Sequence, residues 1–283
     1  MMQLAATQED MIYQAYVRKN APIAGTGYFI SKEALLKHDT YVVLYHAGEP
    51  VLFFSKSTMR DKEKTMLSNF LILADVSIIK TRSLLEEYIK SQSGHSFICV
   101  VEEYLKDEYA MINDGQYEVD HIAIRMWNKD VSRFACPDPE NITIEPFRVG
   151  HDEQRFVDIF NETFVGLCTP TNKEEVIRWT KAPGFYPDLY LFAVKNKKTI
   201  GFIAVEIDID SGISYLQEIG VGREERNTSA AGFLICTAYR SVRDKGVKCM
   251  GVGVLKRNVG AYKFFSKWGF EELYRRIFLR RIV

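Results

Sequence analysis

The fold is decided by the stretch VGREERNTSAAGFLI, which occupies residues 221–235. An apolar, β-rich run ends at Val221, a short polar turn follows, and an apolar helix begins near Ala230. The first N–H groups of a helix lack intrahelical partners and point at one spot, where the helix dipole favours negative charge. The stretch therefore predicts a strand–turn–helix unit whose backbone can hold a phosphate.

Two interpretations of the side chains in this turn stay open. The small side chains at 229–231 allow a phosphate to approach the backbone, and Arg226 can add a charge-assisted contact. The polar residues at 227–229 are equally good helix caps, which would satisfy the same N–H groups without any ligand. Spacing alone does not separate capping from phosphate binding.

Charge and composition exclude several classes of function. The 283 residues include 37 basic and 37 acidic side chains, so the net charge of zero gives no electrostatic reason to expect nucleic acid or an anionic membrane. The locally basic tail at 275–281 is interleaved with apolar residues and is typical of an edge strand. No apolar run approaches the roughly 20 residues that cross a bilayer, and no signal peptide is recognisable.

The cysteines and histidines indicate neither a disulfide framework nor a metal site. The five cysteines form no Cys-x-x-Cys pair and their number is odd, so we expect a reducing, cytoplasmic setting. Cys168 is a candidate nucleophile, but no base lies near it in the sequence, which favours an incidental thiol. The histidines show no metal-ligand spacing.

Two prolines, Pro137 and Pro139, mark the clearest boundary, because each fixes φ and removes a backbone donor. We predict one domain at 1–136 and a second at 141–283. The second domain should contain a strand at 142–147, helices at 152–164 and 174–180, strands at 189–194, 199–207 and 213–221, a helix at 230–243, a strand at 247–254, a helix at 261–268 and a strand at 272–281.

The first half echoes this order weakly. Residues 39–54 resemble the hairpin that begins at 188, and residues 104–125 resemble 262–280, with offsets of about 149 and 154 residues. A repeat of this length indicates duplicated domains, although any two α/β segments can be aligned as loosely. No phosphate-binding turn follows the first hairpin, where residues 55–62 lead into no clear site. The first domain would then shape the acceptor pocket or a dimer surface.

A second segment, NVGAYKFFSKWGF at residues 258–270, helps to interpret the strand–turn–helix stretch at 221–235. Together they resemble the Gcn5-related N-acetyltransferase superfamily, over roughly residues 141–283. Its cofactor turn, Val-x-x-x-x-Arg-Gly-x-Gly-x-Gly/Ala, is matched by Val221, Arg226, Asn227, Ser229 and Ala231. Its later motif, Asn-x-x-Ala-x-x-x-Tyr-x-x-x-Gly-Phe, is matched by Asn258, Ala261, Phe265, Gly269 and Phe270.

This resemblance implies an α/β (or α+β) fold with a mixed, mostly antiparallel central sheet flanked by helices, and a second N-terminal α/β domain. It also implies acetyl-CoA (coenzyme A) as cofactor. The residues expected to bind it are Ile219, Val221, Arg226, Asn227, Thr228, Ser229, Ala230, Ala231, Asn258 and Phe265.

Three positions depart from the family pattern. The two internal glycines of the turn are Asn227, which tolerates positive φ, and Ser229, whose Cβ stands where phosphate should approach. The tyrosine that often serves as general acid is Phe265, which has no proton to donate. Tyr262, one helical turn earlier, is the candidate substitute, with simple packing as the alternative.

The implied reaction is direct transfer of an acyl group to an amine. A lysine-like amine has a pKa of about 10.4, so exposing its lone pair at neutral pH costs about 4–5 kcal/mol and a base is useful. Glu218 suits that role, and strand alternation should place it on one face with Leu216 and Gly220, although an exposed strand glutamate explains it equally well. A backbone N–H near Val221 would hold the carbonyl oxygen.

The prediction is therefore a coenzyme A-dependent N-acyltransferase. The alternative is a non-catalytic module that senses acyl-CoA or a metabolite, which Phe265 and the glycine-poor turn favour. The expected partner is a small-molecule or peptide amine. A homodimer is possible, and we expect no binding to nucleic acid or to a membrane. Six aromatic residues could line an acceptor pocket, although ordinary core packing explains most aromatic residues in strands. They are Trp179, Phe185, Tyr186, Tyr190, Phe192 and Tyr215.

Overall fold

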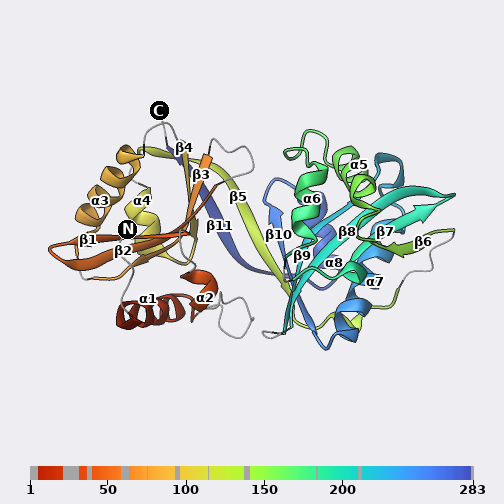
Figure 1. Ribbon diagram of the computed structural model, residues 1–283, viewed down its shortest axis with the longest axis horizontal. Coiled ribbons are helices and arrows are strands. Elements are labelled where there is room, and N and C mark those ends of the chain that lie inside the picture. The colour runs from red at the N-terminus through yellow and green to blue at the C-terminus, as the bar shows by residue number, and fades with distance from the viewer. Residues whose placement is uncertain are drawn as a thin grey trace. The chain divides into compact units, whose positions relative to one another are not determined.

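The computed structural model describes residues 6–21, 32–36, 40–58, 64–74, 76–92, 96–113, 115–136, 141–182, 184–209 and 212–281. The chain forms two compact units (Figure 1). The first comprises Met1–Arg125, Val254–Val259 and Leu273–Val283, and the second comprises Met126–Gly253 and Gly260–Glu272. Most of the last strand therefore belongs to the N-terminal unit. Each unit is built from separate stretches of the chain, so no single boundary along the sequence divides them.

The N-terminal unit holds part of an 11-stranded sheet, with helices on both faces of that part (Figure 1). Its strand order is β1-β2-β3-β4-β11-β5, with β3 and β4 parallel and the pairs β1–β2, β2–β3 and β4–β11 antiparallel. Its elements are α1 (Ala6–Lys19), α2 (Lys32–Leu35), β1 (Tyr41–His46), β2 (Glu49–Thr58), β3 (Lys64–Ile72), α3 (Ile78–Ser91), β4 (Ser96–Glu102), α4 (Lys106–Ile112), β5 (Tyr117–Asn128) and β11 (Glu271–Arg281).

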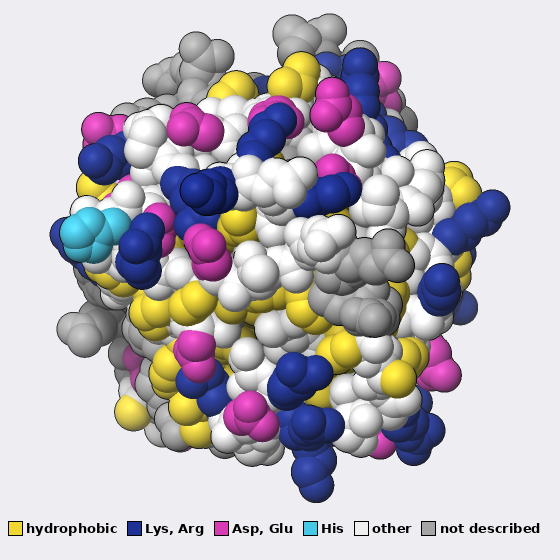
Figure 2. All heavy atoms as spheres, turned by 90° about the vertical axis from the view of Figure 1, so that its right-hand side faces the viewer, with side chains coloured by type: hydrophobic (Ala, Val, Ile, Leu, Met, Phe, Trp, Pro, Cys, Tyr) yellow, Lys and Arg dark blue, Asp and Glu magenta, His cyan; other side chains and the backbone are white. Residues whose placement is uncertain are grey.

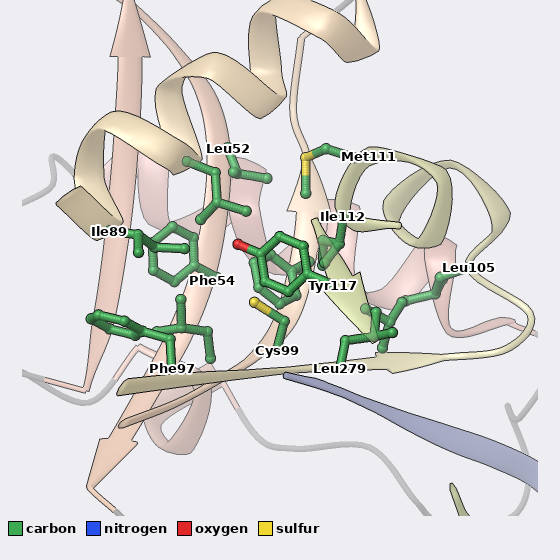
Figure 3. Packing of buried hydrophobic residues seen from close by; sticks show 14 residues of the cluster. Leu52, Phe54, Ile89, Phe97, Cys99, Leu105, Met111, Ile112, Tyr117 and Leu279 are labelled. Atoms are coloured by element: carbon green, nitrogen blue, oxygen red, sulfur yellow. The ribbon is translucent and has the colours of Figure 1, made fainter. Parts of the chain in front are cut away.

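The core of this unit lies mainly between the sheet and helices α3 and α4. Figure 3 shows Phe54 and Ile89 facing Tyr117, whose ring lies over the sulfur of Cys99. The Tyr117 hydroxyl donates a 2.8 Å hydrogen bond to Glu86, which satisfies the one polar atom of the buried ring. A smaller cluster around Ile12, Phe53 and Leu71 packs on α1.

The C-terminal unit has the sheet order β10-β9-β8-β7-β6. Strands β9 and β10 are parallel, and the remaining pairs are antiparallel. Its elements are β6 (Thr143–Pro146), α5 (Glu153–Thr163), α6 (Lys173–Trp179), β7 (Tyr190–Lys195), β8 (Lys198–Asp208), β9 (Ile213–Val221), α7 (Ala230–Asp244), β10 (Cys249–Leu255) and α8 (Val259–Lys267), with short 3-10 turns at Val131–Arg133, Pro187–Leu189 and Arg223–Glu225. The mixed, mostly antiparallel sheet with flanking helices is confirmed, and each predicted element of this half ends within two residues of its expected bounds.

Aromatic residues spaced four apart explain why α5 packs on the sheet. Phe156 and Phe160 both meet Phe202 of β8, with ring centroids 4.9 and 5.9 Å apart. The start of α5 is fixed by Asp152, whose carboxylate accepts hydrogen bonds from the backbone and the guanidinium of Arg148. This packing places the C-terminal end of α5 beside the last residues of β9.

One disulfide joins Cys136 to Cys236 of α7, across 100 residues of sequence. The expectation of uniformly reduced cysteines is wrong for this pair, because a bond between positions so far apart leaves no spacing signal in the sequence. Cys99, Cys168 and Cys249 are not disulfide-bonded. The bond ties the segment after β5 to the helix that follows the predicted phosphate turn.

One face of the C-terminal unit carries charges of both signs side by side. Figure 2 shows Lys and Arg side chains alternating with Asp and Glu over the face at the right of Figure 1. This agrees with the zero net charge and shows no single-sign patch on that face. Among the described residues, no helix is both long enough and apolar enough to cross a membrane.

Candidate functional site

Strands β9 and β10 part within the C-terminal unit. Their parallel ladder pairs residues 213–216 with 249–252 and ends, among the described residues, at Leu216 and Val252, although β9 continues to Val221. A bulge lies immediately beyond, because Val205 and Ala204 of β8 pair with Leu216 and Glu218 and leave Gln217 as the extra residue. The second half of β9 thus presents an edge that β10 does not cover.

Ile219 and Val221 point their backbone groups toward this parted edge. The N–H of Gly222 donates a 2.8 Å bond to Ile200 of β8, so the N–H groups of residues 218, 220 and 222 face β8. In an antiparallel ladder, alternate residues face opposite edges. The N–H and C=O groups of Ile219 and Val221 therefore point away from β8, where an extended ligand can pair with them as a further strand would.

Glu218 lies on the α5 side of the sheet, but not on one face with Leu216. Paired residues of adjacent strands share a face, and the partners of Glu218 and Leu216 are the consecutive residues Ala204 and Val205. The bulge at Gln217 has therefore reversed the alternation, which corrects the sequence expectation for Leu216. Gly220 does share the face of Glu218, as expected, because it pairs with Phe202.

The turn after β9 has the conformation that a phosphate loop needs. Asn227 has a φ of +68°, the left-handed region that the family's glycine would adopt and that asparagine tolerates better than most residues. Residues 226–228 are exposed, and residues 229, 231 and 232 are half-buried, so the turn is not walled off from solvent. Helix α7 begins at Ala230, directly behind it.

The N–H groups of the turn divide into two sets. Thr228 donates its hydroxyl to Glu225 and accepts from the N–H of Ala230 at 3.2 Å, so the capping interpretation holds for this pair. The N–H groups of Asn227, Ser229, Ala231 and Gly232 donate to no atom in the described part of the chain. Ser229 makes no side-chain cap either. The second set is the one that can hold an anion.

Arg226 is placed beside this set. It is exposed, and its guanidinium reaches the carbonyl of Thr163 at the end of α5, 3.5 Å away. A guanidinium carries five N–H donors, so this long contact leaves donors for an anion. Thr163 itself is 7% exposed, and its hydroxyl has no hydrogen-bond partner in the structure. Sequence reasoning missed Thr163, and Gly220 within a strand was the signal, since such a glycine marks a close approach.

The motif at residues 258–270 brings few side chains to the candidate site. Phe265 is 4% exposed and packs against Phe270 with ring centroids 5.3 Å apart, so its side chain belongs to the core. Tyr262 is half-buried on the same helix, α8. Asn258 lies in the loop before α8, where its N–H bonds to Leu255, and belongs to the N-terminal unit. The roles of Tyr262, Phe265 and Asn258 stay predictions.

The aromatic candidates for an acceptor pocket fall into two groups, core residues and pocket-lining residues. Phe185 and Tyr190 pack on each other, Phe192 on Phe147, and Trp179 on Phe156, as core residues do. Tyr186 and Tyr215 instead line a pocket. The described residues contain no group of three or more His, Cys, Asp or Glu side chains that could hold a metal ion.

The N-terminal unit repeats the same strand arrangement. Its parallel pair β3–β4 ends at Leu67 and Cys99, and a register shift against β2 follows at once, where Asn69 has a φ of +54°. Leu73 donates to Val51, as Gly222 donates to Ile200 in the other unit. Ile72 is thus the counterpart of Val221, at an offset that the sequence comparison had indicated for the hairpins.

In this unit the N–H group equivalent to that of Val221 is already occupied. The N–H of Ile72 donates to the carboxylate of Glu108 at 3.4 Å, and that buried carboxylate also pairs with Lys19. Helix α3 is capped by Ser77, whose hydroxyl accepts from the N–H of Lys80. The turn that corresponds to 222–229 lies before α3 rather than at 55–62, of which residues 59–62 lie outside the described part. The N-terminal unit therefore repeats the strand arrangement of the C-terminal one, but a side chain of its own holds the N–H of Ile72.

Comparison with known proteins agrees with this architecture. The model of the acetyltransferase (GNAT) family matches residues 153–270. No curated protein matches the chain. Among solved structures, the chain is similar to a GCN5-related N-acetyltransferase from Sphaerobacter thermophilus, with a TM-score of 0.80, 16% identity and coverage of 98% of this chain and 93% of that one.

Two further structures extend over both units. A tandem GNAT protein from the clavulanic acid biosynthesis pathway gives a TM-score of 0.63 at 13% identity, over 98% of this chain and 96% of its own. A GNAT-family acetyltransferase from Colwellia psychrerythraea gives 0.62 at 11% identity, over 99% of each chain. At such identities these likenesses show the fold, and the family model identifies a GNAT domain at residues 153–270 of the C-terminal half.

Proposed function

We propose that the C-terminal unit transfers an acyl group, acetyl in the simplest case, from coenzyme A directly to an amine. The observation that carries the proposal is the combination of two features on one strand. The turn after β9 holds four N–H groups that donate to no described residue, and the end of β9 leaves the edge groups of Ile219 and Val221 outside its ladder with β10.

The residues present fit coenzyme A. Its diphosphate needs several donors in one place, and the N–H groups of Asn227, Ser229, Ala231 and Gly232 supply them, with Arg226 beside them. Its amide-bearing pantetheine arm can pair with the edge groups of Ile219 and Val221. The Cβ of Ser229 leaves less room for the diphosphate to approach the backbone. The N–H of Ala230 does not contribute to diphosphate binding, because it already donates to the hydroxyl of Thr228. When bound, the cofactor supplies an acyl group activated as a thioester.

The chain's own residues then have three tasks. Glu218 accepts the proton of the incoming ammonium, directly or through water, so that the nitrogen lone pair can form the new N–C bond as the C–S bond breaks. The N–H of Val221 stabilises negative charge that develops on the carbonyl oxygen. Tyr262 donates a proton to the departing sulfur, and the second proton that the nitrogen releases as the amide forms restores the Tyr262 phenol. A base is useful because deprotonating a lysine-like amine at neutral pH costs about 4–5 kcal/mol.

The N-terminal unit is proposed to bind no cofactor. Glu108 occupies the N–H of Ile72, and Ser77 caps α3. Calorimetric titration of the full chain with acetyl-CoA should therefore give one site per chain. A stoichiometry of two would contradict this assignment.

The test of the proposal combines binding and turnover. Arg226→Ala should weaken acetyl-CoA binding about tenfold or more, because a charge-assisted hydrogen bond contributes about 1.5–3 kcal/mol. Arg243→Ala is the matched control, since Arg243 is an exposed arginine at the other end of α7. Thiol release with a panel of amines then measures transfer, and Glu218→Gln should lower kcat about 100-fold, as loss of a general base does.

Two outcomes would contradict the proposal. Absence of acetyl-CoA binding at high micromolar concentration would remove the cofactor site altogether. Tight binding without thiol release from any amine would favour a sensor of acyl-CoA instead. A cytoplasmic location and a homodimer stay predictions.

A further inference from the structure

A pocket of about 580 Å³ opens at the other end of the β8–β9 hairpin from the phosphate turn. Its charged and aromatic lining comes from Tyr186, Glu206, Asp208 and Tyr215, and Ile207 and Ile213 are among the other lining residues. Gly184 closes one side, since its carbonyl accepts from the N–H of Ile207. All of these residues belong to the C-terminal unit.

The pocket lies on the same face of the sheet as Glu218. Glu206 pairs with Tyr215, and Ala204, two residues earlier on β8, pairs with Glu218. Residues two apart on a strand share a face and lie ~7 Å apart, so Glu206 of β8 shares the face of Glu218 and lies diagonally across from it on the neighbouring strand. The bulged Gln217 links them, because its amide donates a 2.7 Å hydrogen bond to Glu206.

Within the described part of the chain, the carboxylate of Glu206 has a neutral hydrogen-bond partner and no cationic one. Gln217 is its hydrogen-bond partner, and it forms no ion pair with any residue that the structure describes. Lys245 approaches the pocket wall, with its ammonium 4.7 Å from the ring centroid of Tyr186, but Asp188 balances that charge at 2.8 Å. Burial and then the charge of Glu206 raise the pKa of the neighbouring Tyr190 phenol. Asp208, more exposed, adds a second carboxylate to the lining.

We propose that this pocket binds the acceptor of the acyl transfer, and that the acceptor is an amine with a second cationic group on a mostly apolar body. The second ammonium lies at Glu206, the apolar body lies against Tyr186 and Tyr215, and the reacting nitrogen faces Glu218. This assignment rests on the proposed function for the position of the reacting nitrogen, but the cation site itself does not depend on it.

The chemistry of the lining selects this class of acceptor. An unpaired carboxylate attracts a cation, and tyrosine faces stabilise ammonium groups and their aliphatic chains. A carboxylate-bearing acceptor such as an amino acid would be repelled by Glu206. The spacing of about two strand residues matches a short diamine, whose two nitrogens are separated by a few methylene groups.

Binding is tested first, without the cofactor. Putrescine and butylamine form a matched pair, with one and the same carbon chain and a second ammonium only in putrescine. Titration of the full chain, followed by NMR or calorimetry, should show putrescine binding at least tenfold more tightly. Glu206→Gln keeps the acceptor for the Gln217 hydrogen bond and removes the charge, so it should abolish that preference. Glu174→Gln, an exposed glutamate on α6, should leave the preference intact.

Turnover is tested second, with saturating acetyl-CoA. Glu206→Gln should raise KM for putrescine about tenfold with little change in kcat, because the second ammonium is not at the reacting centre. Butylamine kinetics should be unchanged by the same substitution. A structural role of Glu206 would instead change both acceptors alike.

The outcomes separate the two proposals. Equal affinity for putrescine and butylamine, or a preference that survives Glu206→Gln, would overturn the acceptor pocket whatever the cofactor result. Failure of acetyl-CoA to bind, with a Glu206-dependent preference for putrescine, would overturn the acyltransfer function and leave a cation site. Putrescine binding that depends on Glu206, with turnover that does not, would overturn its role in acceptor recognition.

Discussion

Gly220 and Thr163 are packed so closely that residue 220 cannot carry a side chain. A Cβ at Gly220 would collide with the Cγ2 of Thr163 and would lie 3.3 Å from the ring of Phe202. The contact joins the end of α5 to the strand that bears both the open edge and Glu218. It fixes the distance between the helix and β9 at the point where the cofactor is proposed to enter.

Gly220→Ala should therefore destabilise the protein by about 1–3 kcal/mol, the usual effect of overpacking a filled core. Thr163→Ala removes the colliding methyl group together with a hydroxyl that has no partner, so alone it should be nearly neutral. Urea unfolding of the two single variants and the double variant measures the coupling. We expect the double variant to recover most of the loss, and additive effects would show that the close contact is not the cause.

Asn227 should respond to substitution according to backbone conformation. Asn227→Val places a β-branched residue at a φ of +68° and should cost about 1–2 kcal/mol, whereas Asn227→Gly should be tolerated. Calorimetry with acetyl-CoA should show affinity kept or increased in the glycine variant and reduced in the valine variant. Equal affinity in both variants would mean that the left-handed turn does not contribute to binding.

The disulfide between Cys136 and Cys236 should stabilise the C-terminal unit. A bond that closes a loop of 100 residues contributes about 2–5 kcal/mol, chiefly by restricting the unfolded chain. Thermal unfolding of the purified protein should shift to lower temperature with a reductant, and Cys136→Ser should remove that shift. Cys168→Ser is the control, because Cys168 is exposed and not disulfide-bonded. Melting that is identical with and without reductant would show that the bond does not form. Its redox state in cells also tests the expected reducing location.

Asp152 should give the C-terminal unit part of its resistance to acid. Hydrogen bonds from Arg148 hold the pKa of this buried carboxyl below its ordinary value of 3.8. A lowered folded-state pKa means stability that is present above the unfolded value and lost as pH falls below about 3.9 through the folded value. Asp152→Asn should cost about 2 kcal/mol at neutral pH and flatten the acid limb. An acid limb that is the same in the variant would contradict this assignment.

The sequence by itself determined the local elements of the C-terminal half and the conformation of its key turn. Periodic apolar residues such as Phe156 and Phe160 specify a helix before any contact is known, and the polar run at 222–229 can only be a turn before an apolar helix. The tolerance of Asn227 for positive φ is likewise a property of the residue alone.

Only the tertiary structure decided which backbone groups and side chains of the site remain accessible to a ligand. The bulge at Gln217 reversed the alternation and separated Glu218 from Leu216, and no residue-level pattern encodes an extra residue in a ladder. Likewise, Glu108 fills the edge at Ile72 while the edge at Val221 stays clear, and the disulfide joins cysteines 100 residues apart. Strand pairing and side-chain contacts bring together positions that are distant along the chain. Local preferences therefore specify the elements, whereas packing specifies the site.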